Sequence, residues 1–196
     1  MRGGICFPIS FEDEQGMTDI SGYAVLCGQD VYTKLIWVFE DISWVSIDNI
    51  VDQQSNILRY HGLSHWLNKA WSEYFANVFF WQQPYHLVKR HRIQIIRSEM
   101  INPKPRFVEV PVTTGNQYMT TDFISAIWEK LKSKTLMHGI KGEPETEIQR
   151  QLAKIKMGEK QMFPGVHALG VCIMGFNRYP WRAPTERPIQ EVFEAA

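Results

Sequence analysis

Residues 64 to 81 have the sequence SHWLNKAWSEYFANVFFW, and the expected fold follows from this stretch outward. Its large apolar residues recur in pairs every four positions, which places them on one continuous stripe of an α-helix. Ser64 stands where an N-cap residue belongs, and Pro84 bars continuation past the stretch. We therefore predict a helix over residues 64–81 whose aromatic stripe is buried by the rest of the chain.

Two further helices are predicted downstream. Residues 121–134 repeat the four-residue apolar spacing, and Thr120 or Thr121 can cap their first turn. Residues 144–157 have a proline in the first turn and a glycine directly after the end, as helices often do. Few residues of this third segment are apolar, so we expect it to lie on the surface.

Runs of β-branched and aromatic residues predict strands in much of the remaining chain. A short edge strand at residues 5–9 is followed by an antiparallel meander, because only short turns separate the runs at 23–27, 31–39 and 44–50. Further strands are expected near residues 93–97, 106–112 and 166–175, the last of them central in the sheet. Together the elements predict an α+β fold with a mostly antiparallel sheet and helices packed on one face.

Composition indicates a protein that folds around its own core. The chain has 196 residues, of which 44% are hydrophobic and 13% aromatic. Its three cysteines have apolar neighbours, which favours reduced, buried thiols over a disulfide framework. No apolar run approaches the roughly 18–20 residues of a membrane span. We expect a cytoplasmic protein without a membrane segment, or one assembled into a particle made in the cytoplasm.

Charge is balanced overall but unevenly distributed. The 21 basic and 21 acidic side chains cancel, which is not typical of a nucleic-acid-binding protein. Acidic residues predominate in residues 1–60 and basic residues in 86–106, where aromatic neighbours could also assist phosphate binding. We favour pairing between the two regions, within one copy or between copies. The basic side chains expected at such a charged interface are Lys89, Arg90, Arg92 and Arg97.

Histidines offer the clearest candidate for a metal site. His61 and His65 are four positions apart and would share a face if both were helical, as metal ligands often do. Gly62 and the expected cap at Ser64 place His61 before the helix, which weakens that geometry. The chain has no Gly-x-Ser-x-Gly nucleophile motif and no glycine-rich phosphate loop. We predict no catalytic residue and no cofactor.

The last twenty residues differ in composition from the preceding chain. Residues 177–196 are expected to form an arm beyond a single domain at 1–176, because prolines interrupt any helix or strand. Tyr, Trp and Arg are enriched at interface hot spots, and proline lowers the entropy lost on docking. The predicted partner-binding residues are Arg178, Tyr179, Trp181, Arg182 and Arg187.

The leading hypothesis is a non-catalytic structural or assembly subunit of a larger complex, for example a virion or phage-particle component. Its partners would be other protein subunits or copies of itself, bound through the arm and the oppositely charged regions. One alternative is a metal-dependent hydrolase or nuclease that uses His61 and His65. Another is a small binding module that acts on an unrelated protein.

Overall fold

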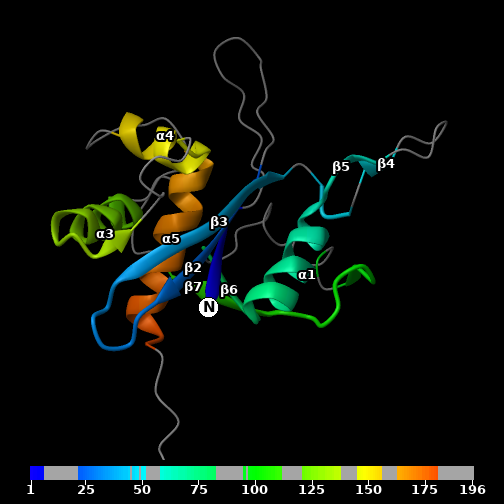
Figure 1. Cartoon of the computed structure of the whole chain (residues 1–196), viewed down its shortest axis with the longest axis horizontal. Helices are drawn as coiled ribbons and strands as arrows, with labels where there is room; N and C mark the ends of the chain where they lie inside the picture. Colours follow the sequence, from blue (N-terminus) through cyan, green and yellow to red (C-terminus); the bar gives the residue numbers. More distant parts are fainter. Residues whose placement is uncertain are drawn as a thin grey trace, which may run out of the picture.

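The computed structural model describes residues 1–6, 22–44, 46–48, 50–51, 58–82, 95, 97–111, 121–137, 145–155 and 163–180 (Figure 1). The main sheet has the strand order β7-β6-β1-β2-β3-β8. Its strands are β1 (Arg2–Cys6), β2 (Gly22–Gln29), β3 (Ile36–Trp44), β6 (Val78–Gln82), β7 (Arg106–Val110) and β8 (Leu136–Met137). A separate two-stranded sheet pairs β4 (Ile50–Val51) with β5 (Leu58–Tyr60). The helices are α1 (Leu63–Tyr74), α3 (Thr121–Lys132), α4 (Glu147–Lys154) and α5 (Pro164–Arg178).

The predicted α+β class is confirmed, and the longest strand pairings are antiparallel. β1 pairs with β2 and β2 with β3 in antiparallel register. Of the expected meander, the pairing between the runs at 23–27 and 31–39 is present. β6, β7 and β8 join in parallel with β1, β6 and β3 respectively. The meander has one long strand, β3, where two runs were predicted, because Glu40 and Asp41 continue the strand instead of turning.

β1 lies at the centre of the sheet and not at its edge, as the sequence had suggested. The edge prediction depended on Pro8, but β1 ends at Cys6, so all of its residues can pair on both sides. Gly4 makes this central position workable. A Cβ added to Gly4 would lie 2.0 Å from the carbonyl oxygen of Ala168, so glycine allows α5 to pack directly on the strand.

The strand predicted at residues 166–175 is wrong, because this segment forms the middle of α5. Its apolar residues occupy every face of the helix, and a helix that is hydrophobic all round is a buried one. Such a segment has no amphipathic period that would separate a buried helix from a buried strand. Figure 1 shows α5 lying across one face of the sheet.

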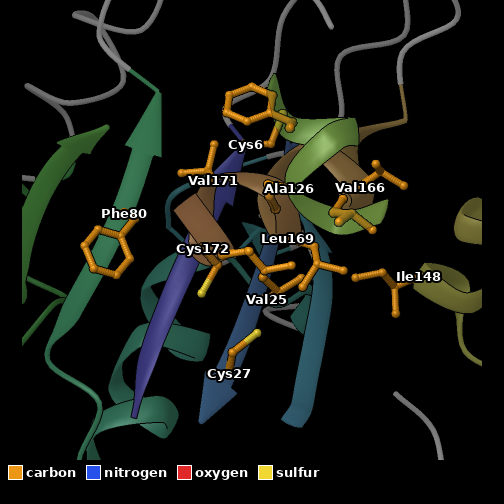
Figure 2. Close-up of a cluster of buried hydrophobic side chains, with 14 of the residues drawn as sticks. Cys6, Val25, Cys27, Phe80, Ala126, Ile148, Val166, Leu169, Val171 and Cys172 are labelled. Atoms are coloured by element: carbon orange, nitrogen blue, oxygen red, sulfur yellow. The ribbon is translucent and has the colours of Figure 1, made fainter. Parts of the chain in front are cut away.

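Helices cover both faces of the sheet, which corrects the expectation of a single covered face. α3, α4 and α5 pack on one face, which we call the α5 face. α1 packs on the opposite face, which we call the α1 face. Strand alternation divides the side chains between them, so that in β2 Val25 and Cys27 point to the α5 face while Ala24 and Leu26 point to the other. Figure 2 shows Val25, Cys27 and residues of α5 within the first of these cores.

The predicted helix 64–81 is two elements. α1 ends at Tyr74, Phe75 adopts a left-handed conformation with φ 53°, and residues 78–82 form β6. Within β6, Phe79 points to the α1 face and Phe80 to the α5 face, so both faces of this strand are apolar. Because both faces of β6 are apolar, its residues happen to continue the four-residue apolar spacing of α1. The spacing alone therefore predicted one long helix.

The start of α1 also differs from expectation. Gly62 is the N-cap, and Ser64 is a buried helical residue whose hydroxyl has no hydrogen-bond partner among the described residues. The amides of Leu63 and Ser64 donate instead to the main-chain carbonyls of Ser46 and Ile47. A Cβ at Gly62 would lie 2.4 Å from the carbonyl oxygen of Ile47, so glycine is what lets these two segments meet.

The remaining predictions are confirmed to different extents. α3 and β7 form within their predicted ranges. α4 is shorter than residues 144–157 and begins after Thr146, which makes a capping box with Gln149. The strand predicted near 93–97 is wrong for its described residues, because Ile95 and Arg97 are helical.

Candidate functional site

His61 and His65 lie together at the start of α1. His61 precedes the N-cap, as predicted, and its ring stacks on that of His65 with 4.0 Å between the ring centroids. Both side chains are exposed. Burial, then the neighbouring His61, lowers the pKa of His65. The two rings are close, and no third His, Cys, Asp or Glu among the described residues joins them in a group that could hold a metal ion.

The predicted charged interface is only partly within the described residues. Arg97 is exposed on the α1 side of the molecule, next to Ser98, which donates a hydrogen bond to Asp48. Lys89, Arg90 and Arg92 lie outside the described residues.

The predicted arm begins inside the last helix. Asn177 and Arg178 complete the last turn of α5, and Arg178 is exposed. Tyr179 stacks on Phe80 with 6.0 Å between centroids, and its carbonyl accepts a hydrogen bond from Arg2. Trp181, Arg182 and Arg187 lie outside the described residues. The described part of the arm therefore ends beside the start of β1.

The carboxyl ends of the parallel strands β1 and β6 form the place where sheets of this kind commonly bind ligands, since the chain crosses over between them. The register that pairs Ile5 with Trp81 brings Cys6 beside Gln82, and both side chains are buried. The first turn of α5 covers this edge. A Cβ on Gly165 would lie 3.1 Å from the ring of Tyr23, the residue paired with Cys6.

The thiol and hydroxyl groups at this edge are buried and protonated. Burial raises the pKa of the Cys6 thiol well above its ordinary value. Burial, together with a hydrogen bond donated to Asp41, raises the pKa of the Tyr23 hydroxyl. His167, in the first turn of α5, is buried with its ring 4.5 Å from that of Phe123. A buried protonated thiol is a poor nucleophile.

An exposed apolar surface lies on the α1 face where α1 ends. We call it the aromatic patch and define it as Met1, Trp37, Phe39, Tyr74 and Phe75. The exposed fractions are 45% for Met1, 46% for Trp37, 45% for Phe39 and 76% for Phe75. Such a concentration of exposed aromatic rings is typical of a surface that contacts another molecule.

Phe39 connects several members of the patch. The rings of Phe39 and Tyr74 have centroids 6.1 Å apart. Phe39 and Met1 both approach Gly28, whose backbone pairs with Trp37. A bulge in the β2–β3 pairing places Phe39 and Glu40 next to each other on the α1 face, and Glu40 accepts hydrogen bonds from Tyr74 and Lys69. The sequence analysis missed these residues, although the aromatic content of β3 was a visible signal.

A pocket of about 440 Å³ opens beside the patch. Its lining includes Met1, Arg2, Gln29, Phe75, Asn77 and Phe176. We call it the Arg2 pocket. The Arg2 guanidinium lies 5.7 Å from the ring centroids of both Phe80 and Phe176. Burial lowers the pKa of Arg2, and no carboxylate among the described residues pairs with it.

Comparison with models of protein families, with curated proteins and with solved structures finds no match. Within the described ranges, no three or more His, Cys, Asp or Glu side chains gather in a way that could hold a metal ion. The helices in those ranges are too short or too polar to cross a membrane.

Proposed function

We propose that this protein is a non-catalytic structural or assembly subunit that binds other protein subunits, for example within a virion or phage particle. The observation that carries the proposal is the aromatic patch. Four of its side chains are exposed by nearly half or more. The role of such a surface is to be covered by a partner.

The free energy gained by covering the patch limits how tightly the patch alone can hold a partner. Removing roughly 300 Å² of this apolar surface from water would contribute on the order of 7 kcal/mol, at about 25 cal/mol per Å². Association itself costs an estimated 4–15 kcal/mol, roughly the same amount. The patch is therefore a plausible centre of an interface, and a stable complex requires additional contacts around it.

The edge formed by Cys6 and Gln82 supports a non-catalytic role. Hydrolysis of phosphate esters commonly uses a hard cation such as Mg²⁺, which prefers carboxylate ligands. At the last described positions of β1 and β6 this chain has a thiol and an amide, and α5 packs over them. These residues do not suit a magnesium ion, so we assign no reaction to this edge.

The proposed partner is protein and not nucleic acid, since the net charge of the chain is zero and offers no long-range attraction to phosphate. The proposed location is the cytoplasm or a particle assembled there. Under this proposal Arg178 and Tyr179, at the start of the arm, add to the contact, together with Trp181, Arg182 and Arg187.

Light scattering coupled to size exclusion tests the proposal. We expect the full chain to form a species larger than a monomer, and the double substitution Trp37→Ser and Phe75→Ser to return it to a monomer. Trp128→Ser is the matched control, because Trp128 is exposed by 46%, as Trp37 is, but lies on α3. Self-assembly that responds equally to both changes, or a full chain that stays monomeric at high concentration, would contradict assembly through the patch.

The rival function, a metal-dependent hydrolase or nuclease using His61 and His65, is favoured by one observation, the proximity of the two imidazoles. It requires a stoichiometric metal in the purified protein and loss of metal on His65→Ala with the fold retained. Elemental analysis of the wild-type chain and of this variant separates the two functions.

A further inference from the structure

We propose that the Arg2 pocket is occupied in the assembly by residues 189–196 of a neighbouring copy of this chain, so that subunits are linked by exchanged C-terminal segments. This inference depends on the proposed assembly function and identifies its contact. Three features carry it, namely the chemistry of the pocket, the composition of the segment, and the place where the described chain ends.

The pocket combines a half-buried cation with apolar walls. Arg2 makes its hydrogen bond to a main-chain carbonyl, that of Tyr179, and lies against two aromatic rings. A second cation, Arg106, is close enough to lower the pKa of Arg2 further. Positive charge that is partly removed from water gains most from a carboxylate, because charge-assisted hydrogen bonds to Arg are among the strongest available.

The pocket has room for such a group and an apolar neighbour. Its volume of about 440 Å³ lies within the range of roughly 300–1,000 Å³ that ligand sites occupy. Phe75 and Phe176 supply apolar wall, and Gln29 and Asn77 supply amide groups at its boundary. The fitting ligand is therefore an acidic peptide segment that also carries apolar side chains.

Residues 189–196 have the sequence IQEVFEAA and match this description. Glu191 and Glu194 are their charged residues, with no cation among them, and Ile189, Val192 and Phe193 are apolar. We assign Phe193 to the apolar wall and a glutamate carboxylate to Arg2. The charges of segment and pocket are complementary.

The place where the described chain ends favours a neighbouring copy over the same one. Tyr179 contacts Arg2, so the described chain ends beside the pocket of its own domain. Prolines at positions 180, 184 and 188 favour an extended course for this stretch. Eight extended residues reach about 25 Å at about 3.1 Å per residue. From sequence we therefore expect residues 189–196 to be carried away from their own pocket and toward another.

A peptide-binding experiment tests the pocket directly. A fluorescein-labelled peptide of residues 189–196 is titrated with the chain truncated after Pro188, and binding is followed by fluorescence anisotropy. We expect saturable binding that weakens about tenfold or more for Arg2→Glu, the scale of a charge-assisted hydrogen bond. Lys154→Glu is the control, since it reverses an exposed charge on α4. Equal binding by the two variants would overturn the assignment to Arg2.

Charge reversal in the peptide keeps the test independent of the folding of the variant domain. A peptide with Glu191→Arg and Glu194→Arg should bind the truncated wild-type domain about tenfold more weakly or worse. The same peptide should regain affinity for Arg2→Glu. Unchanged affinity of the reversed peptide for the wild-type domain would contradict the proposal.

Light scattering separates this inference from the proposed function. If the full chain assembles and the chain truncated after Pro188 is monomeric, exchange of the segment is supported. If the full chain and the truncated chain assemble equally, the proposed assembly is supported, but residues 189–196 are not the contact that links the subunits. If the full chain is monomeric while the isolated peptide binds the truncated domain, the segment occupies its own pocket, and both exchange and self-assembly are overturned.

Discussion

The two faces of the sheet differ in how completely helices cover them. On the α5 face, three helices bury a core in which Val25, Cys27, Phe80 and Cys172 have no measurable exposure. On the α1 face, the 12-residue helix α1 covers the middle of the sheet and ends at Tyr74. Beyond that end the rings of Trp37 and Phe39 are left half exposed. The covered face provides stability, and the partly open face carries the surface that we propose contacts a partner.

The largest expected effect comes from inserting a side chain under α5. Gly4→Val places a Cβ 2.0 Å from the Ala168 carbonyl oxygen, so α5 cannot pack on β1. We expect the free energy of unfolding to fall by more than about 5 kcal/mol, which prevents folding. At Gly28, on the open face, the nearest atom belongs to the exposed ring of Phe39, which can move. Gly28→Val should cost about 1 kcal/mol or less in urea unfolding. Similar losses at both sites would refute the contrast between the faces.

Truncating one phenylalanine on each side tests the same contrast with a smaller change. Phe80 is fully buried beneath α5, so Phe80→Ala should lower the free energy of unfolding by about 3–5 kcal/mol. Phe75 is 76% exposed, so Phe75→Ala should change it by no more than about 0.5 kcal/mol while weakening self-association. Urea unfolding at a concentration that keeps both variants monomeric makes this comparison. A large loss of stability for Phe75→Ala would mean that the patch is part of the core.

A smaller loss of stability is expected when the capping box of α4 is removed. α4 is one of the helices on the α5 face. Thr146 accepts from the amide of Gln149, and the Gln149 side chain accepts from the amide of Thr146. Thr146→Ala should therefore cost about 1 kcal/mol. Ser125→Ala, at an exposed position inside α3, is the control and should cost nothing, because alanine favours helix. Chemical denaturation of both variants gives the difference.

The smallest expected effect is a pH dependence at the start of α1. Because the pKa of His65 is lowered in the folded state, the unfolded chain binds a proton first as the pH falls. His65 therefore favours unfolding progressively below its ordinary pKa of about 6.5 and has no effect well above it. An NMR titration should show a lowered pKa for His65 that rises toward the ordinary value in His61→Gln. A pKa of His65 above 6.5 would contradict the stacked arrangement.

Elements with a strong local signal were predictable. α3 and α4 have amphipathic patterns, capping residues and one clear apolar side, and both form near their predicted positions. The antiparallel β2–β3 pair follows from the short link between two β-rich runs. These features depend on interactions within a few residues of one another.

The failures share one physical cause. α5 and β6 are apolar on both sides because each lies between other layers of the fold, and burial on every side removes the periodicity that distinguishes a helix from a strand. The N-cap of α1 was misplaced for a related reason. Its amides are satisfied by the carbonyls of Ser46 and Ile47, which come from a different element and carry no local sequence signal.

The sequence by itself determined the α+β class, two of the helices, the β2–β3 pairing and an aromatic content too high for a polar surface. Tertiary structure decided which aromatic rings stay exposed. Trp37 and Trp44 belong to the same strand, yet Trp44 is buried and Trp37 is half exposed, because α1 stops before it reaches the start of β3. The exposure of each tryptophan of β3 depends on how far α1, which is distant in sequence, extends across the sheet. The sequence of β3 itself gives no information on that distance.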